Sequence, residues 1–220
     1  MRKPNRWLAV WAVVWVAGLC VLVGVRPGSA ADKKDTKDSP MAAEARETVV
    51  KMAGSVDKKD MDEMKKQATT LAKKLAEADE GYQGLEPVMN LLKLRKMGGL
   101  GVGPKEGVYD PDGIEAKVIA LAKLKLKPAD ITKQADDIAQ LAQVLTVVAQ
   151  IADERKPTKK MGDKDPKDWQ KWTNEMRDSS IDLAAAIKKA NPDPKEINDI
   201  SKKLNASCSD CHAKFKPSKP

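Results

Sequence analysis

Residues 194–216 of the 220-residue chain read PKEINDISKKLNASCSDCHAKFK. Asp193 is suited to cap a helix that begins at Pro194, and Glu196 completes an arrangement like a capping box. Apolar positions spaced three and four apart predict an amphipathic helix. Its inward stripe consists of Ile197, Ile200, Leu204, Cys208 and Cys211. The two cysteines therefore continue the core face of the final helix.

Cys208, Cys211 and His212 form the C-x-x-C-H pattern of covalent c-type haem attachment. Residues three and four apart share one face of a helix, so both thiols can add to haem vinyl groups while His212 gives the iron an axial nitrogen. A disulfide or a thioredoxin-type pair is the alternative, but the chain has no strand pattern for such a fold. Structural zinc needs four ligands, and the exported chain offers these three. We expect one covalent haem c.

The first 31 residues have the features of an export signal. A basic start precedes an apolar run over residues 7–25, and small residues follow it up to Ala31. The apolar run is also long enough to cross a bilayer, so an uncleaved membrane anchor is the alternative to a cleaved signal peptide. Both predict that the body of the protein is periplasmic, outside the cytoplasm, where haem is attached to such motifs.

The composition limits the classes of function. Aromatic residues make up only 4% of the chain, so a core of Ala, Leu, Ile, Val and Met is expected. The net charge is +8, and half of it comes from four basic residues of the leader. The small remaining excess, spread over helices of mixed charge, argues against nucleic-acid binding. The chain has one histidine, assigned to iron, so no catalytic Ser-His or Cys-His pair is expected and the protein is not predicted to be an enzyme.

The periodicity predicts an all-α protein. After a flexible lead-in over residues 32–39, Ser39 caps and Pro40 begins a helical hairpin over residues 40–80. The next region, 85–216, is expected to form an antiparallel four-helix bundle that holds the haem. Its helices are predicted at about 85–124, 128–153, 166–190 and 194–214. The second has an apolar face wide enough for burial on more than one side, and Asp165-Pro166 caps the third.

Residues 98–107, GGLGVGPKEG, interrupt the first of these regions. They do not form a phosphate-binding loop, because the glycine spacing, a preceding strand and a Gly-Lys-Ser/Thr sequence are all missing. Two interpretations remain open. The stretch is a helix stop with an irregular connection, or its backbone closely approaches a flat ligand.

A helical bundle with C-x-x-C-H in its last helix resembles the cytochrome c′ family and its methionine-ligated relatives. The family pattern continues with an aromatic residue and arginine; this chain has Phe215 and Lys216 there. The resemblance implies that Cys208 and Cys211 bind haem, that His212 is the proximal ligand, and that Phe215 and Lys216 belong to the haem environment. Lysine lacks the planar fork of arginine. Members of the family are often antiparallel dimers, which makes a homodimer an expectation here.

The resemblance also implies that the first bundle helix supplies the residue opposite His212, either a methionine or an apolar residue. Met89 is the preferred methionine, with Met97 as its alternative and Met52, Met61 or Met64 available if the hairpin covers the haem. Methionines at helical spacing also serve as core filling. A methionine predicts a one-electron carrier that works with redox partner proteins, since Met/His ligation raises the potential. An open site predicts a five-coordinate haem protein that binds nitric oxide or carbon monoxide for sensing or detoxification.

Overall fold

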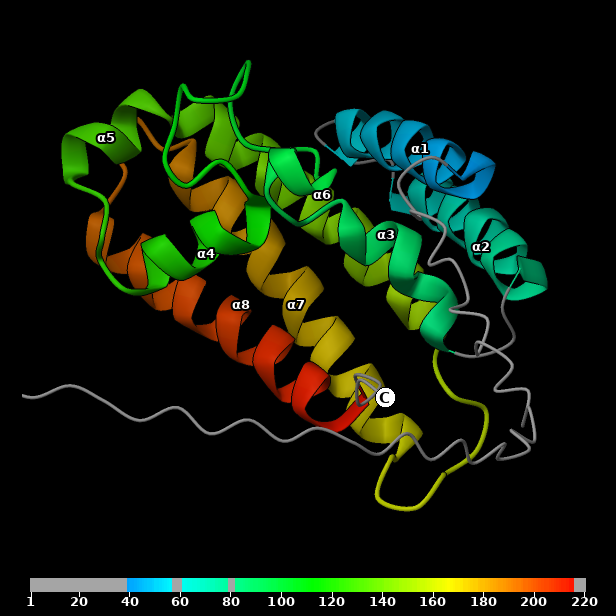
Figure 1. The fold of residues 1–220 in the computed structure, drawn as a ribbon. Coiled ribbons are helices and arrows are strands. Elements are labelled where there is room, and N and C mark those ends of the chain that lie inside the picture. Colours follow the sequence, from blue (N-terminus) through cyan, green and yellow to red (C-terminus); the bar gives the residue numbers. More distant parts are fainter. Residues whose placement is uncertain (1–38, 57–60, 79–81, 216–220) are drawn as a thin grey trace, which may run out of the picture. The chain divides into compact units, whose positions relative to one another are not determined.

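A computed structural model describes residues 39–56, 61–78 and 82–215, all within one compact unit (Figure 1). Apart from a bridge between Met161 and Lys164, the regular structure of these residues is helical, which confirms the all-α prediction. The elements are α1 (Pro40–Val56), α2 (Met61–Ala78), the 3₁₀ turn η2 (Tyr82–Leu85), α3 (Glu86–Asn90), the 3₁₀ turn η3 (Arg95–Met97), α4 (Ile114–Ala122), α5 (Pro128–Lys133), α6 (Ala135–Glu154), α7 (Pro166–Ile187) and α8 (Pro194–Phe215). The predicted leader, its apolar run over 7–25, the lead-in before Ser39, and Lys216 lie outside the described residues.

The first two helices pack against each other and against α6. The predicted cap of α1 is confirmed, since the Ala42 amide donates to the hydroxyl of Ser39. Glu44, near the start of α1, pairs with Lys74, near the end of α2, so the two helices run antiparallel. Their facing sides bury small and apolar residues: Ala45, Val49, Met52, Met64, Ala68, Leu71 and Leu75.

The predicted first bundle helix at about 85–124 is not continuous: the expected interruption at residues 98–107 is present, and the α-helical parts on either side of it are only α3 and α4. The chain instead forms the five-residue α3, the η3 turn, an irregular run to Gly113 and then α4. Gly98, Gly101, Gly103 and Gly107 all have left-handed backbone, with φ between 77° and 89°, and such residues cannot continue a right-handed helix.

The glycine stretch is an irregular connection whose backbone closely approaches other parts of the chain. A Cβ at Gly103 would lie 2.5 Å from the ring of Tyr109, and one at Gly101 would lie 2.3 Å from the Arg95 guanidinium. The Arg95 guanidinium also donates to the Gly103 carbonyl. In the described structure, these glycines therefore make room for two of the chain's own side chains.

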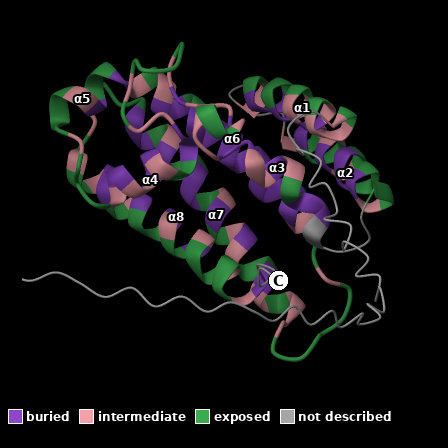
Figure 2. Cartoon of the chain, in the orientation of Figure 1, coloured by how far each residue is buried: buried purple, intermediate pink, exposed green. Residues whose placement is uncertain are grey.

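Helix α6 is the most buried element (Figure 2). Every residue from Leu141 to Ala152 is buried, because α1 and α2 pack against this helix and so does α7. This confirms the prediction of burial on more than one side. The predicted helix over 128–153 is divided at Gln134, where α5 ends and α6 begins.

Helices α7 and α8 form a long antiparallel pair. Glu196 in the first turn of α8 binds Lys189 just after α7, and Phe215 at the end of α8 contacts Trp169 near the start of α7. On another side α8 packs against α4, where the buried Asn198 amide donates to the carbonyls of Leu121 and Ala122. Asn198 thus satisfies the Ala122 carbonyl, which no described backbone amide reaches, and adds a second donor to the Leu121 carbonyl, which also accepts from the Leu124 amide.

The predicted caps of α7 and α8 are confirmed, with one correction. The Asp165 carboxylate accepts from the Lys167 amide, and that of Asp193 from the Lys195 amide, each at 2.9 Å. Glu196 does not turn back to close a capping box, because both of its oxygens accept from Lys189, at 2.7 Å. A full positive charge is a stronger partner for the carboxylate than a backbone amide.

Candidate haem-attachment site

The C-x-x-C-H residues occupy the last two turns of α8. At 3.6 residues per turn, Cys208, Cys211 and His212 span an arc of about 100° around the helix. Both cysteines are half-buried and pack against the hydrophobic core, whereas His212 is exposed. The two thiols thus lie at the boundary of the core, and the imidazole follows at the edge of the same face.

Burial dominates the chemistry of the two thiols, which are free in this structure. It raises the pKa of Cys208 to about 11, with a contribution from the carboxylate of Glu115 on α4, and raises the pKa of Cys211 to about 12. Redox-active and nucleophilic cysteines need the opposite shift, since their thiolate is the reactive form. The environment of these thiols therefore favours a neutral sulfur, which is what a thioether provides.

Aromatic contacts hold the last turn of α8 in place. The buried Phe215 ring meets Trp169 edge-on, with centroids 5.0 Å apart, and meets Trp172 at 6.1 Å. Trp169 is in turn fixed to α6, because its indole nitrogen donates to the Ala152 carbonyl at 2.8 Å. Next to this cluster Lys214 forms an ion pair with Asp168, and this pair holds the pKa of the Asp168 carboxyl below its ordinary value. The motif turn is thus tied through α7 to the most buried helix.

The predicted ligand Met89 is connected to the motif through α4. The Leu92 amide donates to the Met89 carbonyl, and the Leu92 carbonyl accepts from the Glu115 amide. Glu115 is close enough to Cys208 for its charge to raise the pKa of the thiol. The segment that carries Met89 therefore lies against the turn of α4 nearest to Cys208.

The candidate methionines differ in their surroundings. Met89 is half-buried on α3, which packs against α1 and η2, while Met97 is 47% exposed. Met52 and Met64 are buried between the hairpin and α6, where they fill the core, and Met61 is half-buried.

Two residues near the motif were not singled out as site residues from the sequence. Glu115 was missed because its closeness to Cys208 depends on the packing of α4 against α8. The second residue is Met176 on α7. The pairs Lys189–Glu196 and Trp169–Phe215 fix the antiparallel register of α7 and α8, and that register places the buried Met176 opposite the turn carrying Cys208. Counting back from the α7–α8 connection could have found this second neighbour.

The donor set fits a haem better than a bare ion. In the described part of the chain, no group of three or more His, Cys, Asp or Glu side chains is placed to hold a metal ion. A bare ion needs ligands that converge on one point. Haem c is bound through two vinyl groups and through iron, so its attachment points are spread over a large ring. Two thiols and one imidazole along a single helical face match attachment points that are spread in this way.

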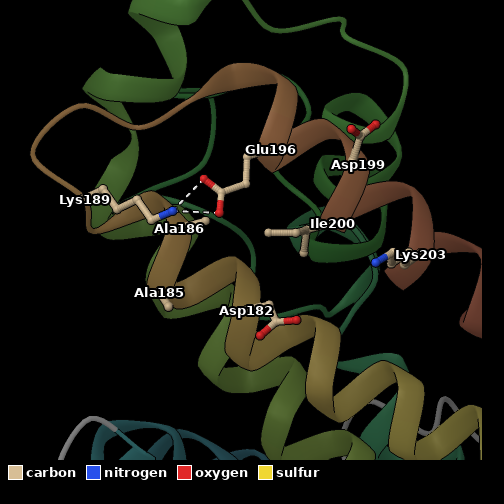
Figure 3. Close-up of a pocket in the computed structure, with 8 residues that line it drawn as sticks. All are labelled: Asp182, Ala185, Ala186, Lys189, Glu196, Asp199, Ile200 and Lys203. Carbon is tan, nitrogen blue, oxygen red and sulfur yellow. Dashed lines mark hydrogen bonds and ion pairs between the residues drawn. The ribbon is translucent and has the colours of Figure 1, made fainter.

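The other end of the α7–α8 pair carries a shallow pocket of about 490 Å³ (Figure 3). Its lining is Asp182, Ala185, Ala186, Lys189, Glu196, Asp199, Ile200 and Lys203. The Lys189–Glu196 pair spans it, and it contains none of the motif residues.

No helix within residues 39–56, 61–78 and 82–215 combines the length and apolarity needed to cross a membrane. A comparison with models of protein families finds no matching family, and comparisons with curated proteins and with solved structures find no match either.

Proposed function

We propose that this chain is an exported, periplasmic monohaem c-type cytochrome that carries one electron between redox partner proteins. The observation that carries the proposal is the placement of C-x-x-C-H on the last turns of α8, with both thiols against the core. Bound haem would supply a single iron that alternates between its ferric and ferrous states. The proposed role is that of an electron carrier and not of an enzyme.

In this proposal Cys208 and Cys211 form the two thioethers and His212 is the proximal ligand. Thioether formation replaces each thiol with a neutral sulfur that cannot ionise, which suits two groups whose ionisation burial disfavours. The contacts of Phe215 with Trp169 and Trp172 fix the turn from which His212 projects. A fixed ligand keeps structural change on electron transfer small. Lys216 is proposed, with Phe215, as part of the haem environment.

The proposed architecture is a cytochrome c′-like bundle of α4, α6, α7 and α8, with α1 and α2 added on the outer side of α6. Its support is the packing of α6 with α7, α7 with α8, and α8 with α4. The region 85–122 would stand in for the first bundle helix, although only α4 is a regular helix of more than five residues there. A homodimer remains part of the proposal.

Met89 is the proposed distal ligand and Met97 its alternative. The support is the pair of backbone hydrogen bonds that joins Met89 through Leu92 to Glu115, the residue whose charge acts on Cys208. Binding at the distal position would require the side chain of Met89, now half-buried, to reach the haem from the α4 side.

A second function is favoured by a different observation. Helix α3 packs against α1 and η2, whereas α8 packs against α4 and α7. If Met89 keeps its present packing, the distal side stays open, and the protein would bind nitric oxide or carbon monoxide as a sensor or in detoxification.

The absorption spectrum of the reduced, haem-loaded protein tests these alternatives. The carrier predicts a sharp low-spin spectrum that carbon monoxide does not change, and the gas-binding protein predicts a broad high-spin spectrum that carbon monoxide shifts. Met89→Ala should convert the low-spin spectrum to high-spin, while the matched Met97→Ala should leave it unchanged. A low-spin spectrum unaffected by Met89→Ala would refute Met89 as ligand and leave the carrier in place.

A further inference from the structure

The connection from α6 to α7 and the start of α7 form one strongly basic segment of the protein. Residues 155–171, here called the basic rim, contain seven Lys and Arg residues and three Asp residues, a net charge of +4. The whole chain carries +8, of which residues 1–38 contribute +4. The net charge of residues 39–220 is therefore +4, equal to that of the basic rim, and in the rest of that region basic and acidic residues are equal in number.

The basic rim lies at the end of the fold that carries the haem-attachment motif. It comprises the connection from α6 to α7 and the first turns of α7, and Figure 1 shows this connection beside the end of α8. Two contacts join it to the motif helix: Lys214 pairs with Asp168, and Phe215 packs against Trp169. Each of these α8 residues is about one turn from Cys211.

The carboxylates of the basic rim are largely engaged within the protein. Asp168 pairs with Lys214, and Asp165 accepts from the Lys167 amide and lies 3.9 Å from the Lys160 ammonium. By contrast, the side chains of Lys156, Lys159 and Lys167 are exposed, and no described carboxylate forms an ion pair with any of them. These ammonium groups are available to a partner.

We infer that the basic rim is the docking surface for an acidic redox protein that exchanges one electron with the haem. This inference rests on the proposed function and specifies its partner. Charges clustered beside a reacting centre steer an oppositely charged partner and raise the association rate, and salt screens the effect. Complementary charge of this kind also discriminates against partners of the wrong sign.

The test uses the haem-loaded protein and an anionic probe, hexacyanoferrate(III). In the measured step ferrous haem loses one electron and becomes ferric, and the probe gains that electron and becomes hexacyanoferrate(II). The rim variant is Lys156→Glu with Lys159→Glu. The control is Lys123→Glu with Lys125→Glu, which changes the net charge equally. These control lysines are exposed and follow α4 beside Asn198, ten residues or about 15 Å along α8 from Cys208.

At about 10 mM ionic strength, the rim variant should be oxidised roughly fivefold or more slowly than the control, and the difference should disappear near 500 mM. The cationic oxidant tris(phenanthroline)cobalt(III) should reverse the order of the two variants. Equal slowing of both variants, or no slowing of the rim variant, would overturn the inference that the basic rim is the docking surface. The proposed function would stand in that case, provided that a haem-specific stain shows covalent haem. Absence of stain in the wild-type protein would instead overturn the proposed function, and the inference with it.

Discussion

Phe215 stands edge-on to Trp169, with ring centroids 5.0 Å apart and ring planes at 90°. This contact joins the last turn of α8 to the first turns of α7, and the Trp169 indole continues the connection to α6 through the Ala152 carbonyl. Edge-to-face pairs contribute about 0.5–1.5 kcal/mol beyond the burial of the rings. The turn that carries Cys211 and His212 is therefore held by a rigid aromatic cluster.

Replacement of Phe215 should loosen this turn. Phe215 is 2% exposed, so Phe215→Ala should lower the free energy of unfolding by about 3–5 kcal/mol. Phe215→Leu should lower the free energy of unfolding by less than Phe215→Ala does, because leucine fills part of the space. It should still lower this free energy, because leucine cannot form the edge-to-face contacts. Urea unfolding followed by circular dichroism measures both values. A loss below about 1 kcal/mol for Phe215→Ala would show that the cluster does not hold α8.

The two thiols should make the haem-free chain sensitive to alkaline pH. Their pKa values, about 11 for Cys208 and about 12 for Cys211, exceed the ordinary value of 9, so the unfolded state loses these protons first. The resulting stabilisation is fully present below pH 9 and is lost as pH rises through 11 and 12. Unfolding in reductant at pH 8, 9, 10 and 11 measures the decline.

The double variant Cys208→Ser with Cys211→Ser is the control for the alkaline decline. Serine does not ionise in this range, so the stability of the variant should fall less steeply with pH than that of the wild type. The same pKa values predict that alkylation of either folded thiol by iodoacetamide at pH 8 is slower than alkylation of the unfolded chain. Equally fast alkylation would contradict the burial of the thiols.

Gly103 should tolerate alanine less well than Gly107. Both have left-handed backbone, at φ 87° and 79°, so each substitution carries a strain of roughly 1–2 kcal/mol. A Cβ at Gly103 would also meet the Tyr109 ring at 2.5 Å, whereas one at Gly107 has no atom within 4 Å. The difference in stability between the two variants, measured by thermal unfolding, reports the clash with the Tyr109 ring. Equal losses of stability would mean that the ring moves aside without cost.

Asn198→Ala should weaken the contact between α8 and α4. The Asn198 side chain is 3% exposed, and its loss leaves the Ala122 carbonyl without a donor and the Leu121 carbonyl with backbone donors alone, at roughly 1–3 kcal/mol. Hydrogen exchange should quicken at the amides of α4 before those of α6. Asn191→Ala, at an exposed site, should change neither the exchange nor the stability.

The sequence predicted the parts of the fold that depend on local chemistry. Ser39, Asp165 and Asp193 cap their helices as expected, because an acceptor before a proline at the first helical position is a local signal. The wide apolar face of α6 likewise predicted that this helix is buried on more than one side. The part that was wrong is residues 91–97, where apolar spacing resembles a helix but the chain forms turns, whereas the interruption at the left-handed glycines that follow was expected.

The site was predictable to the extent that it lies on one helix. The spacing of Cys208, Cys211 and His212 is a property of α8 alone, and so is the core-facing stripe that leads to the two cysteines. Glu115 could not be found in this way, because its effect on Cys208 arises from the packing of α4 on α8. Phe215 was expected from its place beside the motif, but its contacts with two tryptophans of α7 depend on the register of two helices.

The most direct test of the central claim is the intact mass of the exported protein after expression with a haem-attachment system. We predict a mass increase of one haem that survives denaturation and is lost in Cys208→Ala with Cys211→Ala. After proteolysis, the peptide containing Cys208, Cys211 and His212 should carry the added mass. An unmodified wild-type mass, with both thiols still open to alkylation in the unfolded chain, would contradict the account.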